Sequence, residues 1–317
     1  MINKTTMAQC LFMLQNSDIS KTIQFFQKNK NLKPNFGFLN LQDHSYPNWL
    51  KNRPQLIHLS WMFKHIFYQR TRFLKRNIVK ELSELNSIET VKSPHFNILD
   101  IGCGDGQFAF FAKNKFENIR IFCNDISVNN IEFCELYSSH FNLTDVEPSI
   151  EMNSNDMQCA DIVFAFSVLQ YVEDEIGFLK SIQHRMNSNG KLLLYVPINH
   201  RKIGWLYMIL FHSFETYESS QNRKKIYSMV QLQSILKQSG FGISNTTYAC
   251  GNNGIRAQEW TSNAITLISQ SNVIYKIIGA VYLSLATIPI LIYQFKDKFN
   301  PQNEQTSNAV LLECKVL

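Results

Sequence analysis

The stretch that decides the fold runs from Asn97 to Gln107 and reads Asn-Ile-Leu-Asp-Ile-Gly-Cys-Gly-Asp-Gly-Gln. Its apolar beginning is typical of a buried β-strand, and the alternate glycines after it predict a sharp turn into a helix. Gly102, Gly104 and Gly106 have no Cβ atom, so they permit unusual φ values and let a ligand approach the backbone. Exposed amides at the helix start favour an anionic group, and Asp100 can accept hydrogen bonds from a cationic or hydroxylated part of the same ligand.

The segment Leu99 to Gly106, LDIGCGDG, resembles motif I of the class I S-adenosylmethionine-dependent methyltransferases. Its glycines follow the spacing G-x-G-x-G, whereas a nicotinamide-binding fingerprint reads G-x-G-x-x-G. A nicotinamide dehydrogenase is therefore the weakest rival. The resemblance covers about residues 95–250 and a final strand from residue 308 onward. It implies an α/β fold with a doubly wound, Rossmann-like seven-stranded sheet whose last strand is antiparallel, and S-adenosyl-L-methionine as the cofactor.

The composition indicates a globular protein of the cytoplasm. The chain has 317 residues, of which 45% are hydrophobic, enough to bury a substantial core. Its seven cysteines form no C-x-x-C pair, so we expect reduced thiols and no metal site. The first residues lack a long apolar core, and we expect no signal peptide. No basic and aromatic interleaving indicates nucleic-acid binding.

The positive charge is concentrated at the N-terminal end. The net charge is +6, but residues 1–95 hold 14 Lys and Arg against 5 Asp and Glu. We assign residues 1–94 to a helical extension or cap and residues 95–317 to the methyltransferase domain. Residues 1–57 suggest two short helices and a loop.

A single basic amphipathic helix is expected over residues 58–86, because apolar residues recur there at spacings of three and four. We favour a helix that packs on the catalytic domain and leaves its basic face solvated. Contact with an anionic membrane surface or substrate is the alternative. In the family, helices ahead of motif I often cover the active site and help to select the acceptor.

The expected elements of the catalytic domain alternate between strands and helices. We expect strands over residues 97–101, 119–125, 149–152, 161–166, 191–197 and 309–316, and helices over residues 127–140, 178–186 and 229–238, with a turn over residues 187–190.

The acid at the end of the second strand is a candidate for the donor's ribose. Asp125 lies about 20 residues beyond the glycine loop, where a doubly wound sheet places a carboxylate on ribose hydroxyls. Asp125 and Ile126 resemble the family's ending of this strand, and Asn124 is a weaker candidate. The resemblance further implies that Asp156 meets the adenine amino group and Met157 packs on the ring. An ordinary polar loop at those two positions is the alternative.

The segment after the fourth strand resembles the family's next motif and adds Ser167 and Gln170 to the cofactor-binding set. The family often has paired histidines or aromatics where this chain has Gln170 and Tyr171. This departure removes an obvious imidazole base. Tyr171 either lines the methyl-transfer cleft or caps a core helix. His200 and His212 come nearest to a general base, although a single histidine in a loop is more often structural.

An uncharged stretch of transmembrane length covers residues 277–295. The chain must return from it to the final strand of the sheet, and Pro289 interrupts it. We therefore expect a buried helix plus turn, in an apolar insertion at about residues 273–295. A monotopic apolar patch that reaches lipid is the alternative, which would make the protein membrane-associated.

These patterns together predict methyl transfer to a small-molecule or lipid-like acceptor, at O, N or C. The aromatic stretch after the fifth strand and the apolar insertion favour a hydrophobic acceptor pocket. In-line displacement at an activated methyl mainly requires alignment and exclusion of water, and it requires a base only if the acceptor must lose a proton. Two alternatives are a cofactor-binding scaffold without catalysis and a membrane-surface interaction module with peripheral membrane contact. The sequence specifies neither the acceptor nor the oligomeric state.

Overall fold

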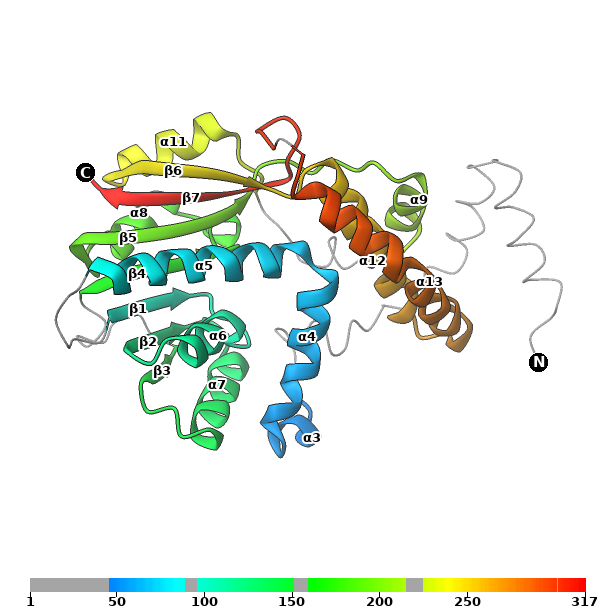
Figure 1. Ribbon diagram of the computed structural model, residues 1–317, viewed down its shortest axis with the longest axis horizontal. Coiled ribbons are helices and arrows are strands. Elements are labelled where there is room, and N and C mark those ends of the chain that lie inside the picture. Colours follow the sequence, from blue (N-terminus) through cyan, green and yellow to red (C-terminus); the bar gives the residue numbers. More distant parts are fainter. Residues whose placement is uncertain (1–45, 89–95, 151–158, 215–224, 301) are drawn as a thin grey trace.

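The computed structural model describes residues 46–88, 96–150, 159–214, 225–300 and 302–317, and a seven-stranded sheet forms its centre (Figure 1). The strand order is β3-β2-β1-β4-β5-β7-β6. β1 to β5 pair in parallel, whereas β7 is antiparallel to both of its neighbours. This confirms the expected fold. The strands are β1 (Phe96–Ile101), β2 (Ile119–Asn124), β3 (Val146–Ser149), β4 (Ala160–Phe166), β5 (Met186–Pro197), β6 (Phe241–Ala249) and β7 (Ala309–Val316).

Helices cover both faces of the sheet, and successive strand residues alternate between two cores. Ile98 of β1 packs into the core that α5 and α6 share, whereas Leu99 packs into the core under α8 and α11. The helices are α3 (Asn48–Lys51), α4 (Ile57–Phe67), α5 (Gln69–Ile88), α6 (Gln107–Lys115), α7 (Val128–His140), α8 (Glu175–Gln183), α9 (Trp205–Ser213), α11 (Met229–Gln238), α12 (Asn252–Ile268) and α13 (Val273–Asp297), with 3-10 turns η3 (Pro54–Leu56) and η5 (Leu169–Tyr171).

The expected single helix over residues 58–86 is wrong, because α4 and α5 are separate helices. Tyr68 ends α4 in an extended conformation, with φ −103° and ψ 107°. The chain changes direction at this residue, so that α5 lies along the face of the sheet while α4 runs past the ends of the strands (Figure 1). Most of the expected first helices, in residues 1–45, lie outside the described residues.

The expected turn over residues 187–190 is also wrong, because β5 already begins at Met186. The β4–β5 register shifts between Ala160 and Ile162, as at a β-bulge. A bulged strand holds polar residues and glycine, which resemble a turn in the sequence. The third strand, Val146–Ser149, ends where the expected one begins.

The apolar stretch near the C-terminal end forms one continuous helix, α13, with Pro289 inside it. The expected buried helix plus turn is therefore wrong in both respects, since only 17% of its most apolar 18-residue window is buried. Among the described residues, this is the one helix that is long and apolar enough to cross a membrane. A Cβ atom on Gly279 would lie 2.8 Å from the backbone nitrogen of Ile268, so α13 approaches α12 closely.

The buried carboxylate of Asp297 joins the end of α13 to two other helices. It accepts hydrogen bonds from the backbone N–H of Gly254 at 2.8 Å and of Gly251 at 3.2 Å, at the start of α12. The start of a helix favours an anion because its first N–H groups have no partner within the helix. Gln69, the first residue of α5, donates its side-chain amide to the same carboxylate at 2.6 Å. Asp297 thereby ties α12 and α13 to the N-terminal helices.

We expect Asp297→Ala to lower the free energy of unfolding by about 3 kcal/mol, because several buried donors lose a charged acceptor. Chemical denaturation measures this change. Glu132→Ala, which removes a half-exposed acid 3.6 Å from Lys51, is the control and should leave stability unchanged. A loss below about 1 kcal/mol in Asp297→Ala would contradict the linking role.

Candidate functional site

The loop between β1 and α6 takes its shape from glycine backbone conformations and from bonds to β2. Gly102, Gly104 and Gly106 have φ angles of +66°, +58° and +70°. The N–H groups of Gly102 and Cys103 donate to the carbonyl of Asn124, at 2.7 and 3.1 Å. A Cβ atom at Gly102 would lie 2.4 Å from the side chain of Val168, so only glycine fits there.

The carboxylate of Asp125 is held at the end of β2 by two backbone donors. One oxygen accepts from the N–H of Gly104 and the other from the N–H of Ser127, both at 2.9 Å. Each oxygen keeps a further lone pair for a ligand hydroxyl. Ile126, beside it, is 94% exposed and presents apolar surface. The amide of Asn124 instead donates to the carbonyls of Ser149 and Ile150, so this weaker candidate supports the sheet edge.

A cavity of about 220 Å³ lies next to the glycine loop, between the ends of β4 and β5, the start of α5, and helices α9 and α12. Several predicted site residues line it, namely Asp100, Gly102, Gly104, Ser167, Gln170, Tyr171 and His200. The other predicted residues in the described chain, Gly106, Asp125, Ile126 and His212, are not among its lining residues. Asp156 and Met157 lie outside the described residues.

Asp100, which lines this cavity, has an unsatisfied carboxylate oxygen. The side chain is only 2% exposed, and its Oδ2 atom has no hydrogen-bond partner in the described part of the protein. Burial raises the pKa of this carboxyl well above its ordinary value, and Cys103, Asp125 and Asp105 raise it further. Buried polar atoms normally have partners. The arrangement therefore fits a ligand that brings a donor, ideally a cationic one.

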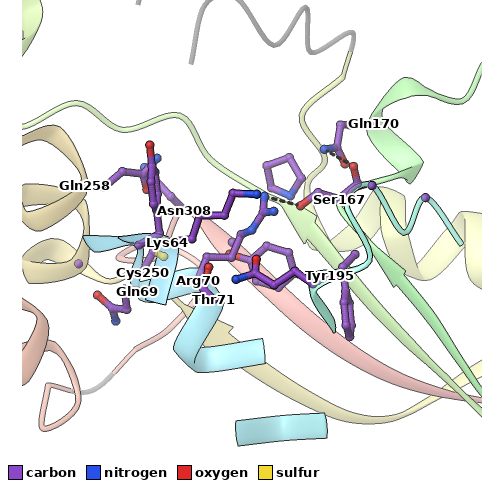
Figure 2. A pocket seen from close by; sticks show the side chains of 18 of the residues that line it. Lys64, Gln69, Arg70, Thr71, Ser167, Gln170, Tyr195, Cys250, Gln258 and Asn308 are labelled. Carbon is purple, nitrogen blue, oxygen red and sulfur yellow. Dashed lines mark hydrogen bonds between the residues drawn. The ribbon is translucent and has the colours of Figure 1, made fainter. Parts of the chain in front are cut away.

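A second unsatisfied acceptor belongs to Gln170. Ser167, at the end of β4, has a φ angle of +62°, and its carbonyl accepts from the Gln170 amide at 2.9 Å (Figure 2). This bond orients the Gln170 side chain, whose Oε1 atom is buried without a partner among the described residues. Gln170 and Asp100 thus give the same cavity two acceptors that lack donors.

The two N-terminal helices supply cations that the sequence interpretation had placed on a solvated face. Lys64 of α4 forms an ion pair with Asp105 of the glycine loop at 2.5 Å. Arg70, near the start of α5, donates to the Ser167 hydroxyl at 3.2 Å (Figure 2). Both residues line the cavity. Their positive charge was visible in the sequence, but the change of chain direction at Tyr68, which places them at the cavity, was not.

The far wall of the cavity is mixed rather than hydrophobic, so the expected apolar acceptor pocket is wrong. The loop after β5 contributes His200, Arg201 and Lys202, and α12 contributes Gln258. Of the aromatic residues of α9, only Tyr207 lines the cavity. α13 contributes no lining residue.

His212 takes no part in this wall. It lies on the exposed side of α9, with its ring 6.0 Å from that of Phe211. The loop before α9 owes its shape to buried Glu259 of α12, whose two oxygens accept from the N–H groups of Ile203 at 2.6 Å and Gly204 at 2.8 Å. Glu259 and Gln258 went unnoticed in the sequence because α12 has no ligand motif.

Comparisons with known proteins point to methyltransferases. Residues 99–192, from β1 into β5, match a family model described as a methyltransferase domain. Malonyl-[acyl-carrier protein] O-methyltransferase of Calditerrivibrio nitroreducens is 29% identical over 126 residues, which are 40% of this chain and 48% of that relative. Malonyl-[acyl-carrier protein] O-methyltransferase 1 of Ilyobacter polytropus is 28% identical over 98 residues, 31% of this chain and 36% of that relative. The chain thus covers half or less of the length of these curated relatives.

A solved structure extends the likeness in fold to nearly the whole chain. Coclaurine N-methyltransferase, in complex with N-methylheliamine and SAH, superposes with a TM-score of 0.52 at 14% identity. The match covers 96% of this chain and 87% of that one. The family match around the glycine loop and the likeness in fold both point to methyltransferases, in agreement with the motif that resembles the class I S-adenosylmethionine-dependent family.

Proposed function

We propose that this protein transfers a methyl group from S-adenosylmethionine to a carboxylate oxygen of a small-molecule or lipid-like acceptor. One observation carries the proposal that the donor binds here. The buried Oδ2 atom of Asp100 has no partner among the described residues, and it lies beside a glycine loop in which Gly102 has no room for a Cβ atom. The proposal of an anionic acceptor is supported by cations that line the same cavity, among them Arg70 and Arg201.

The residues around the glycine loop suit each part of this donor. Asp100 would accept from its ammonium group, and the Asp125 carboxylate would accept from its ribose hydroxyls. Ile126 would pack on the adenine ring, and Gln170 offers a further acceptor. S-Adenosylmethionine supplies a methyl group already activated by a sulfonium. The protein therefore has to orient donor and acceptor and to exclude water.

A carboxylate acceptor makes no demand on a general base in this cavity, whether or not His200 could act as one. An ionised carboxylate has no proton to lose, so it needs no general base. Arg70 donates to Ser167, and Arg201 donates to Asn252 at 2.8 Å, so the guanidinium group of each bonds to a neutral side chain. Such groups favour an anion. The two curated relatives are named as O-methyltransferases of malonyl-[acyl-carrier protein], which also favours an oxygen atom of an acyl compound as the acceptor. Tyr171 and His200 remain candidates for positioning it.

We expect Asp125→Ala to weaken binding of S-adenosylmethionine by about 100-fold, since two charge-assisted hydrogen bonds to the donor are lost. Titration calorimetry measures the Kd. Glu132→Ala should bind as the wild type does, and melting curves verify that both variants fold. Absence of binding to the wild-type protein would contradict the donor assignment.

We expect donor affinity to rise with pH by up to tenfold per unit, until Asp100 is ionised, and then to level off. The raised pKa keeps the carboxyl neutral at low pH, and a cationic ligand requires it ionised, so binding releases a proton. Calorimetry in buffers of different ionisation enthalpy measures this release. In Asp100→Asn the release should vanish and affinity should fall. The same pH slope in that variant would assign the effect to another group.

We expect methyl-labelled donor to label an acyl compound that ends in a free carboxylate and to leave its terminal carboxamide unlabelled. Arg201→Gln should raise the KM for the carboxylate about tenfold and change kcat little, because the ion pair orients the ground state and the transition state alike. Product mass spectrometry and rate assays measure both effects. A product methylated at N or C would contradict the acceptor assignment. Absence of any labelled product from cell extract would favour the scaffold alternative.

A further inference from the structure

Helix α13 packs on the protein through one side and leaves large apolar residues exposed on the other. Gly279, Ala286 and Ile290 are buried, and Gly279 lies where α13 approaches α12 closely. Leu285 and Ile288, on the outside, are 76% and 69% exposed. A half-buried helix ordinarily has charged and polar residues on its outer face.

The exposed apolar residues form one face along the whole helix. Residues at spacings of three and four make up this face, namely Val273, Ile277, Val281, Leu285, Ile288, Ile292 and Phe295, followed by Phe299 just beyond the helix end, and Ile278 and Leu291 are exposed beside it. The 25 residues of α13 make a rod about 37 Å long. Contiguous apolar patches of this extent mark interaction sites on soluble domains.

The charges beside this face are of one sign. Lys276, Lys296 and Lys298 are exposed near the two ends of the helix. Its one acid, Asp297, is buried and bonded to α12. On the adjacent side, Arg256 of α12 is exposed and lies 5.9 Å from the ring of Tyr293. An apolar face with these exposed cations beside it in the described part of the chain complements an anionic lipid surface.

The connections of α13 to the domain exclude a membrane-spanning orientation. The helix begins a few residues after α12, which it packs along, and it is followed by β7, which lies between β5 and β6 in the sheet (Figure 1). A spanning helix would place one of these attachments on the far side of the bilayer. We propose that α13 lies in the plane of an anionic bilayer, with its apolar face among the acyl chains and its lysines at the headgroups, and so docks the protein on the membrane. Because α13 does not line the cavity, this surface is separate from the proposed methyl-transfer site.

The test is flotation of the full-length protein with phosphatidylcholine vesicles that contain about 30% phosphatidylglycerol, and with vesicles of phosphatidylcholine alone. We expect binding to the anionic vesicles that weakens between about 0.1 and 1 M salt. Leu285→Asp with Ile288→Asp should lower the partition coefficient at least about tenfold. Val230→Asp, at a residue 74% exposed on α11, is the matched control and should bind as the wild type does. Changing the three lysines to Gln should remove most of the preference for anionic lipid, about fivefold for each lysine.

Circular dichroism and calorimetric donor binding verify that each variant is folded. Failure of the wild-type chain to float overturns the proposal, as does undiminished flotation of the Leu285 and Ile288 variant. Binding that resists alkaline carbonate extraction indicates spanning and overturns the in-plane orientation. Light scattering gives another outcome. If the wild-type protein is a dimer that does not bind vesicles, and the Leu285 and Ile288 variant is a monomer, the face binds a second copy of the chain and the proposal is overturned. If deletion of residues 1–45 alone enables flotation, that segment covers the face, which equally overturns the proposal.

Discussion

The hydrogen bonds between the glycine loop and the end of β2 are the constraint on which the site depends. Gly102 and Cys103 donate to Asn124, and Gly104 donates to the Asp125 carboxylate, so a loop with left-handed backbone angles is tied to the neighbouring strand at three consecutive residues. β1 lies between β2 and β4, the position in a doubly wound sheet where the connections leave in opposite directions. The bonds therefore fix the loop at this crevice, beside Asp100, whose Oδ2 atom has no donor among the described residues.

The N-terminal helices complete this crevice, and they do so through polar contacts. The hydroxyl of Tyr46 donates to Asn130 of α7 at 3.0 Å, and Lys64 pairs with Asp105 of the loop. Arg70 then reaches the end of β4. The division of the chain near residue 94 stays a prediction about domains, but it does not divide the site, because one wall of the cavity comes from each side of that boundary. In the basic segment for which membrane contact was the alternative, Lys64 and Arg70 are thus engaged with other parts of the protein.

The sequence specified the parts of the fold that depend on local patterns. The Ser228 capping box and the apolar spacing of α11 place that helix at Met229–Gln238, as expected, and the final strand also has its expected bounds. Features that depend on distant partners were not predictable. α12 buries Thr261 and Ser262 and has no clear apolar stripe. The orientation of α13 follows from its small residues facing α12, whereas its apolar composition alone suggested burial. The positions of Lys64 and Arg70 at the cavity depend on the change of chain direction at Tyr68, which no glycine or proline marks.

The position of β7 also constrains the order in which this protein can assemble. β7 is the last described strand in the chain, yet it lies between β5 and β6 and is antiparallel to both. Until it inserts, the facing edges of β5 and β6 have unpaired backbone groups, and such edges can pair with other chains. The α12–α13 hairpin must already have left the plane of the sheet for the chain to come back to this gap. Before β7 is made, the sheet is therefore incomplete, with two unpaired strand edges and an exposed apolar helix. We expect aggregation to compete with folding mainly at this stage, until β7 pairs with β5 and β6.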